Sequence, residues 1–531
     1  MIARKSVLVL LQNVAGAVLG AVAIKVTSLY LGKAVIGEFQ AALGFLGLLY
    51  FLTDLGFGSA HTKRVSEGMD PADCLATFAV FKAVVTGAFI AVSLGVLGFR
   101  VLVLGKPLVD ATPVTFLVVL SYMAVKSLVS IPGSTFDARR ETARGQLVLF
   151  AETVVRVGLT VLVSLVVAAV LKETGPFADS AIAGTGFAAW ARANPAAAFG
   201  LAWLGGALIS LFVGLAYLPS STPWGRFRPE ILRSYWTYAL PIFLVSAIHV
   251  VSTYLDKAAL AYFWSDVEVG RFSQPRAITG FLENLPTAVV LLLFPTISAL
   301  HASGRHEAIE AATHKAERYV SMLVLPAVVV LLVYAEAVIR VALSAEWLDA
   351  IWTLRILAVY SLFIALTRPS VAVLLGVDRP GTAARIGVAM AATNIVLILV
   401  LVPPSLRIVP VPLPGLADVG AALATAVSGV VGFVLFRRAA GRPVVTGWLV
   451  KHALAGLVMA ALCWALAMLV DGPMRAWHLL GFSFLGGLLY LATLSALGEF
   501  RRSDVEFFLE TMHAGRLLGY VRGELGPPRR E

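Results

Sequence analysis

The chain has 531 residues, of which 59% are hydrophobic and 14% are charged, and its formal net charge at pH 7 is +11. Soluble globular domains carry roughly 25% charged residues, so this composition excludes an ordinary water-soluble enzyme or binding domain. The basic residues are spread over many loops and form no single patch, which argues against a nucleic-acid partner.

Long apolar runs follow one another along the chain and predict an all-α, polytopic membrane protein with about 14 transmembrane helices. The runs do not alternate between polar and apolar residues. Because backbone groups in lipid must be satisfied within their own segment or in a closed barrel, helices are expected. The predicted spans are 6–31, 35–60, 74–104, 111–138, 141–172, 195–218, 231–263, 267–301, 310–334, 346–375, 380–402, 418–437, 446–470 and 475–498.

The distribution of Lys and Arg over the loops predicts the orientation in the membrane. Counting from a cytoplasmic N-terminus, about 21 basic residues fall on that side and about 8 on the other, so both termini are expected in the cytoplasm and the location is the inner (plasma) membrane. Residues 501–531 are predicted to be an amphipathic cytoplasmic tail, in which Ser503 and Glu506 have the spacing of a capping box. The only cysteines, Cys74 and Cys463, suggest no disulfide framework.

Prolines interrupt several of the predicted helices. Each removes a backbone donor and permits a bend that alternating access could use, although bends without motion are equally common. They include Pro241, Pro275, Pro286, Pro295, Pro326 and Pro369.

Two segments that are far apart in the chain have similar sequences. Residues 35–60 align with residues 269–300, and this alignment pairs Gly37 with Gly270. Each segment opens an even-numbered predicted helix after an outer loop. The similarity indicates that a block of helices has been duplicated.

A second alignment has a similar offset: residues 136–162 match residues 376–402 and pair Arg139 with Arg379. The offsets move six helices onto six, an even number, so the two halves share one orientation about an axis along the membrane normal and are expected to enclose a cavity. The predicted organisation is an N-lobe at 1–218, a C-lobe at 219–437, helices 13 and 14 within 438–500, and the tail at 501–531.

These segments resemble the multidrug/oligosaccharidyl-lipid/polysaccharide exporter (MOP) superfamily, specifically its polysaccharide-transporter branch, which includes O-antigen flippases. The resemblance implies an alternating-access transporter with two six-helix lobes and two additional C-terminal helices. It also implies movement of a lipid-linked oligosaccharide from the inner to the outer leaflet. The residues that carry it are 37–60, 254–273, 374–404 and 415–429.

Charged residues lie inside several predicted spans, where a Lys, Arg or Asp at the helix centre costs about 2.5–3.5 kcal/mol. Cations outnumber carboxylates, which favours an anionic ligand such as a polyprenyl phosphate or pyrophosphate headgroup. The cations expected to bind it are Arg276, Lys25, Lys257, Lys126 and Arg368. Of these, Lys25, Lys257 and Arg276 lie in the outer parts of their helices and are expected to converge across the lobes.

The resemblance singles out Arg276. It stands nineteen positions before Pro295, as does an arginine implicated in substrate binding in the related lipid II flippases. The alternative is an arginine that extends to the outer headgroups from near the start of its helix.

The intramembrane carboxylates are candidates for coupling to H+ or Na+. Glu283 is the first choice because it lies seven residues past Arg276, on nearly the same helical face; a simple pair with that arginine is the alternative. Asp256 and Asp54 are further candidates, unless each meets water or an ion-pair partner. Glu152 lies four residues before an arginine in the order that favours a helix-stabilising pair.

No motif indicates an enzyme. The chain has no G-x-x-x-x-G-K-[ST], G-x-S-x-G or H-E-x-x-H sequence, so no cofactor and no metal site are predicted. The competing interpretation is a multidrug or toxin extruder of the same fold, which should have an excess of carboxylates inside its lobes. The expected partners are a polyprenyl-linked oligosaccharide, a coupling ion, and membrane glycosyltransferases or a polymerase.

Overall fold

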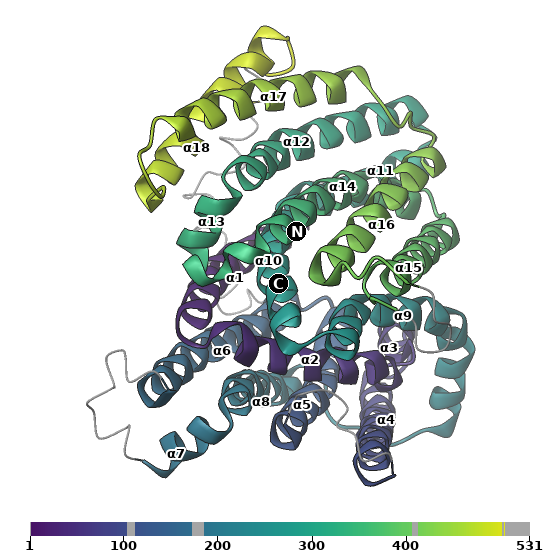
Figure 1. Cartoon of the computed structure of the whole chain (residues 1–531). Coiled ribbons are helices and arrows are strands. Elements are labelled where there is room, and N and C mark those ends of the chain that lie inside the picture. The colour runs from purple at the N-terminus through teal and green to yellow at the C-terminus, as the bar shows by residue number, and fades with distance from the viewer. Residues whose placement is uncertain (1, 104–111, 172–184, 406–411, 502–503, 505–531) are drawn as a thin grey trace. The chain divides into compact units, whose positions relative to one another are not determined.

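A computed structural model of the chain describes residues 2–103, 112–171, 185–405, 412–501 and 504 (Figure 1). All regular elements in these ranges are helices, and an isolated bridge between Ser405 and Pro412 is the one strand-type pairing there. The predicted all-α class is therefore confirmed. Apart from Arg501 and Asp504, the predicted tail and its capping box lie outside the described residues.

The helices of the first half follow the predicted spans closely. A 3-10 segment (η1, Tyr50–Thr53) and a π-helical turn (η2, Phe99–Val103) interrupt or extend them. In chain order they are α1 (Ile2–Tyr30), α2 (Gly32–Leu49), α3 (Phe57–Ser66), α4 (Pro71–Gly98), α5 (Pro113–Ala138), α6 (Thr142–Leu171), α7 (Gly186–Ala193), α8 (Pro195–Ser221) and α9 (Pro229–Phe263).

The second half continues in the same way. Twelve helices of the described chain are long and apolar enough to cross a membrane, and they correspond to predicted spans one to six and nine to fourteen. The predicted seventh span corresponds to α9, and the predicted eighth span is divided into α10 and α11. The elements are α10 (Asp266–Asn284), α11 (Thr287–Ala302), α12 (His306–Val333), α13 (Ala335–Ala342), the 3-10 segment η4 (Ala345–Ala350), α14 (Ile351–Gly376), α15 (Pro380–Leu401), α16 (Ala417–Ala439), α17 (Gly447–Met468) and α18 (Ala476–Ala496).

Proline and capping side chains set where several helices begin. Pro71 and Pro113 stand in the first turns of α4 and α5, where the missing N–H has no intrahelical acceptor in any case. Asp70 accepts hydrogen bonds from the first N–H groups of α4, and Thr112 caps Thr115 at the start of α5.

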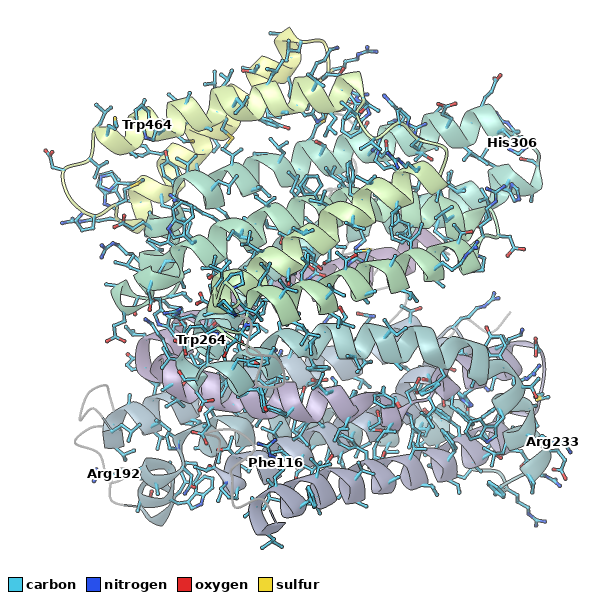
Figure 2. The ribbon with its side chains drawn as sticks, turned by 45° about the vertical axis from the view of Figure 1, so that its right-hand side comes forward. Phe116, Arg192, Arg233, Trp264, His306 and Trp464 are labelled. Atoms are coloured by element: carbon cyan, nitrogen blue, oxygen red, sulfur yellow. The ribbon has the colours of Figure 1, made fainter. Side chains whose placement is uncertain are left out.

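Large apolar side chains are exposed on many of these helices. Phe212, Leu480, Phe484 and Trp464, the last labelled in Figure 2, are examples from α8, α18 and α17. In water such surfaces would promote aggregation, whereas in a bilayer they contact acyl chains. Composition, helix length and surface therefore agree that the protein passes through a membrane many times.

The chain groups into two compact units. The first unit comprises Ala15–Gln274 and Ala391–Ala424, and the second comprises Met1–Val14, Pro275–Met390 and Thr425–Glu531. The predicted lobes are defined by sequence duplication, which this grouping does not test, and they stay a prediction.

In the first unit, α8 packs closely between α5 and α6 because glycines line its contact face. A Cβ atom built on Gly206 would lie 2.6 Å from Arg156 Cβ, and one built on Gly214 would lie 2.6 Å from Pro132 Cγ. Without a hydrophobic driving force in lipid, such close backbone approach is what holds helices together. A cluster of buried aromatic residues, including Phe57 and Phe136, fills the space between α3, α4 and α5.

In the second unit, α12 and α14 lie side by side. Helix α11 packs against both of them, and α17 packs against α12. Ile297 packs against Gly376 at the end of α14, where a Cβ atom would lie 2.6 Å from the isoleucine side chain. Trp347, fully buried in η4, closes the connection into α14.

The turns after α5 and α14 have the same hydrogen-bond pattern, which is common at helix C-termini. Arg140 and Asp378 both have positive φ, at 61° and 58°. The following residues, Glu141 and Arg379, each donate to a carbonyl five residues earlier, at 2.8 Å. The same pattern follows α16 and α18, where Arg442 and Glu499 donate to carbonyls five residues earlier, so it is a general helix ending and does not test the alignment of Arg139 with Arg379.

Candidate functional site

The two segments of the first sequence alignment are both broken helices. The predicted eighth span stops at Asn284 and resumes at Thr287, since Pro286 has no backbone N–H to donate. The predicted second span stops at Leu49 and resumes at Phe57 after η1. Helices interrupted at corresponding places of a duplicated membrane protein commonly mark its binding site.

A charged pair lies at the break of the predicted second span, in the first unit. Lys82 Nζ lies 3.1 Å from Asp54 Oδ1 and donates to the Thr53 carbonyl at 2.8 Å. Asp54 Oδ1 also accepts from the Gly58 N–H at 3.2 Å, at the start of α3. The buried lysine therefore satisfies a carbonyl near the break, and the partner that sequence analysis anticipated for Asp54 is Lys82.

A second charged pair lies just before the break of the predicted eighth span, in the second unit. The Arg276 guanidinium binds both carboxylate oxygens of Glu283: Nη1 donates to Oε1, and Nη2 donates to Oε2 at 3.3 Å. The side chains of Arg276 and Glu283 are 30% and 13% exposed. The i, i+7 spacing places them on one face of α10, so the predicted candidates for phosphate binding and ion coupling are in direct contact.

Two residues of α14 support this pair. The Arg276 guanidinium lies 5.1 Å from the centre of the Tyr360 ring, a cation–π distance. The Ser361 hydroxyl lies 3.4 Å from Glu283 Oε1 and 3.2 Å from the Thr279 carbonyl of α10. These contacts fix the orientation of the pair, and neither supporting residue was identified from the sequence.

Lys126 has a carboxylate partner on the neighbouring helix. Its Nζ lies 2.6 Å from Glu152 Oε2, and Glu152 is buried. Arg156, expected to pair with Glu152 along α6, lies 4.8 Å from the centre of the Trp203 ring instead. Among the described ion pairs, Glu152 is thus joined across helices and not along its own helix.

The remaining predicted site residues have different surroundings. Lys257 Nζ donates to Gln40 Oε1 at 2.7 Å, and the neighbouring Asp256 is buried. Lys25 is half-buried on α1, and Arg368 is exposed on α14. Because Lys25 and Lys257 belong to the first unit and Arg276 to the second, their convergence stays a prediction.

Sequence analysis missed several buried polar groups, of which two are examples. Glu317, inside the predicted ninth span, is fully buried against Arg437 at 3.2 Å. His61, also fully buried, contacts Tyr235 Oη at 3.0 Å and Thr135 Oγ1 at 3.1 Å. No local signal identifies them, because their partners lie far away in the chain. The described residues contain no cluster of three potential metal ligands.

Comparison with known proteins places this geometry in context. The family described as "Polysaccharide biosynthesis protein" matches residues 180–352. A protein of Haloferax volcanii described as "Probable low-salt glycan biosynthesis flippase Agl15" is 24% identical over 439 residues, which is 82% of each chain.

Two solved structures have a similar fold. A structure described as the lipid II flippase MurJ in an inward closed conformation matches with a TM-score of 0.69 at 14% identity, over 92% of this chain and 98% of that one. An inward-facing multidrug resistance MATE family transporter matches with a TM-score of 0.57 at 14% identity, over 80% and 94% of the two chains. Together these findings confirm the resemblance to the MOP superfamily and its polysaccharide-transporter branch.

Proposed function

We propose that this chain, with the fold and the sequence relatives of the MOP superfamily, is a flippase for a lipid-linked oligosaccharide. It moves a glycan carried on a polyprenyl phosphate or pyrophosphate from the cytoplasmic to the outer leaflet of the inner membrane, for the synthesis of a cell-surface polysaccharide or glycan. The family match and the name of the Haloferax relative support this class of substrate. Both termini are cytoplasmic in this proposal, and the chain is a transporter with no catalytic step.

The observation that carries the proposal is the pair of Arg276 and Glu283 beside the break between α10 and α11. An unpaired guanidinium inside a membrane is costly, and a carboxylate partner lowers that cost while no ligand is bound. Two oxygens of a phosphate group can accept from a guanidinium in the same way and bind it through two parallel hydrogen bonds. The substrate phosphate therefore replaces Glu283 on Arg276.

This exchange links substrate binding to an ion. When phosphate takes Arg276, the Glu283 carboxylate loses its counter-charge and becomes a site for H+ or Na+. Asp54 and Asp256 are further coupling candidates in the first unit. The cations proposed to complete the phosphate site during alternating access are Lys25, Lys257, Lys126 and Arg368.

The proposal is tested by reconstituting the purified protein in liposomes with a fluorescent sugar linked to a polyprenyl pyrophosphate. Arg276→Glu should abolish its translocation, because a carboxylate at this place repels the phosphate. The matched control is Arg340→Glu, since Arg340 lies on α13 and pairs with the exposed Glu336 at 2.9 Å. Equal thermal midpoints would show that both variants are folded. Unchanged transport by Arg276→Glu contradicts the proposal.

The second candidate is a cation-coupled multidrug or toxin antiporter. A MATE family transporter has a similar fold, with a TM-score of 0.57, so the fold is compatible with this function. The same liposomes loaded with an organic cation such as ethidium distinguish the two functions. Export of the cation without movement of the lipid-linked sugar favours the antiporter. Co-purification with membrane glycosyltransferases or a polymerase would support the flippase.

A further inference from the structure

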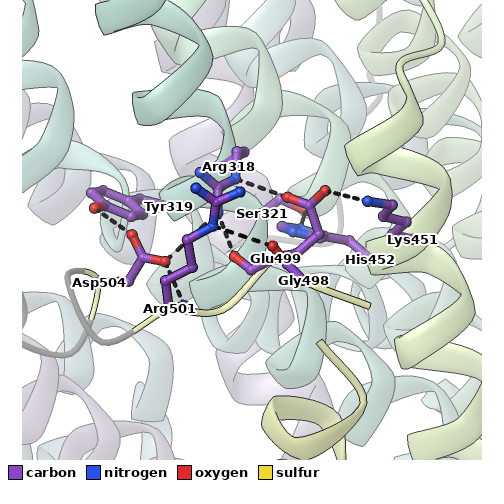
Figure 3. A network of polar contacts seen from close by, with 9 residues as sticks. All are labelled: Arg318, Tyr319, Ser321, Lys451, His452, Gly498, Glu499, Arg501 and Asp504. Atoms are coloured by element: carbon purple, nitrogen blue, oxygen red, sulfur yellow. Dashed lines mark hydrogen bonds and ion pairs between the residues drawn. The ribbon is translucent and has the colours of Figure 1, made fainter. Parts of the chain in front are cut away.

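The first half of α12 is attached to the segment that follows α18 by a cluster of charged groups. Figure 3 shows Arg318 of α12 between two carboxylates. Its Nε lies 3.0 Å from Glu499 Oε2, and its Nη2 lies 3.7 Å from Asp504 Oδ2. Arg318 also donates to the backbone carbonyl of Glu499. One guanidinium thus holds both the side chain and the backbone of the segment after α18.

Each carboxylate has a second partner. Lys451, near the start of α17, donates to Glu499 Oε1 at 2.9 Å, and the Tyr319 hydroxyl donates to Asp504 Oδ1 at 2.8 Å (Figure 3). The backbone N–H of Arg501 donates to the other oxygen of Asp504 at 2.9 Å. The cluster therefore joins three elements: α12, the start of α17 and the segment after α18.

Buried polar contacts extend the same junction on both sides. His452 of α17, which is fully buried, lies with Nδ1 2.9 Å from Ser321 Oγ of α12. Next to Arg318, Glu317 pairs with Arg437 at the end of α16 and with Arg442 in the following loop, at 3.2 Å and 3.5 Å. Residues 317–321 of α12 therefore make charged or hydrogen-bonded contacts with the C-terminal part of the chain.

Elsewhere, apolar contact attaches α17 and α18 only weakly. Their outer faces are apolar and exposed, with Leu480 at 72%. Because lipid tails are as apolar as leucine, burying these side chains against α12 brings little stabilisation in a bilayer. What remains is close packing, as at Gly456 against Leu325, and a hydrogen bond at the other end of α12, where the Tyr334 hydroxyl donates to the Cys463 carbonyl at 2.7 Å.

We propose that Arg318, Glu499 and Asp504 form a latch that fixes the α17–α18 hairpin to α12. The hairpin lies outside the helices that are predicted to be duplicated. The latch supplies charge-assisted bonds where apolar packing supplies little, and it makes the hairpin a permanent part of the second unit. Loss of Arg318 leaves two carboxylates without their shared cation and releases the hairpin.

A cysteine introduced by Leu325→Cys reports whether the hairpin is docked. Leu325 is buried on α12 and packs against Gly456 of α17, so this position is covered by the hairpin itself. Replacing Cys74 and Cys463 with serine leaves the introduced thiol as the single one, and its reaction with N-ethylmaleimide is followed in the full-length, purified protein. Undocking exposes the thiol and speeds labelling.

Arg318→Gln and Glu499→Gln should each raise the labelling rate about tenfold, the effect of losing a charge-assisted bond. In the double variant the two effects should combine to less than their product, because the Arg318–Glu499 pair that both substitutions remove is lost only once. The matched control is Glu310→Gln, whose side chain is 75% exposed and pairs with Arg442 at 3.1 Å; it should label at the parental rate.

Equal labelling in the latch variants and the control overturns the proposal, as does a double variant in which the two effects combine to their full product. Should Arg318→Gln aggregate, Asp504→Asn and Tyr319→Phe remove one bond each and are measured in its place. Faster labelling in both supports the latch, and parental rates in both overturn it.

Discussion

Gly37 of α2 and Gly270 of α10 lie against one another's helix in the first unit. A Cβ atom built on Gly37 would overlap the Asp266 carbonyl oxygen, and one built on Gly270 would overlap the Lys33 carbonyl oxygen. Each carbonyl belongs to the residue four positions before the opposite glycine. The two glycines are also those that the sequence repeat aligned, so equivalent positions of the duplicated segments meet in a nearly symmetric contact.

This contact predicts that a single methyl group at either glycine is destabilising. Gly37→Ala and Gly270→Ala should each lower stability by about 1–3 kcal/mol, because the opposing group is a backbone carbonyl that cannot move aside. The measurement is the thermal midpoint in detergent. The control is Gly87→Ala on α4, where nothing lies within 4 Å and alanine favours the helix. A midpoint for Gly37→Ala equal to that of the control would rule out the close approach.

The ion pair of Lys126 and Glu152 predicts energetic coupling between α5 and α6. Removing either partner should cost about 1–3 kcal/mol, since the buried carboxylate or the half-buried ammonium is left without a counter-charge. A double-mutant cycle with Lys126→Gln and Glu152→Gln should therefore be non-additive. The parallel cycle with Arg156→Gln and Glu152→Gln should be close to additive. An additive cycle for Lys126 and Glu152 together with a non-additive cycle for Arg156 and Glu152 would instead support the i, i+4 pair along α6.

The competition between Glu283 and phosphate predicts tighter binding when the carboxylate is removed. Glu283→Gln should raise the affinity for a short-chain polyprenyl phosphate about tenfold, because Arg276 no longer has a charged competitor. Binding is measured by titration of the detergent-solubilised protein. Glu336→Gln on α13 is the control, because Glu336 lies on the exposed surface. Weaker binding would mean that Glu283 supports the ligand and does not compete with it.

The latch predicts a specific dependence of stability on pH. Burial raises the pKa of Glu499, but the hydrogen bond from Lys451 and the charges of Arg318 and Lys451 outweigh it and hold the pKa below its usual value. Stability from a carboxyl group with a lowered pKa is present above the unfolded pKa of about 4.3 and is lost as pH falls through the folded pKa.

Thermal midpoints of the parent and of Glu499→Gln test this dependence. Besides Arg318 and Lys451, the charged and titratable neighbours of Glu499 include His452 and Asp504. The difference between the two midpoints should be constant above about pH 5 and should shrink on further acidification. A difference that grows in acid would contradict the lowered pKa.

The break in the second predicted helix could not be predicted from the sequence. The break between α2 and α3 contains no proline; Leu55 and Gly56 have φ of 48° and 82°. Tertiary packing holds the leucine in this rare conformation, because its side chain lies against the buried cluster that includes Ala239 of α9. The break at Pro286, by contrast, was marked in the sequence by a residue that cannot donate.

The sequence alone determined the all-α class and the succession of spans, because a bilayer accepts only segments whose backbone groups are satisfied locally, and such segments are continuous in the chain. Tertiary structure decided which charges meet. Arg276 pairs with Glu283 on its own helix, as their spacing in the sequence allows. Glu152 pairs with Lys126, and Glu317 pairs with Arg437, in each case on another helix. An ion pair depends on distances of a few ångströms between helices, and those distances are set by packing that no local pattern contains.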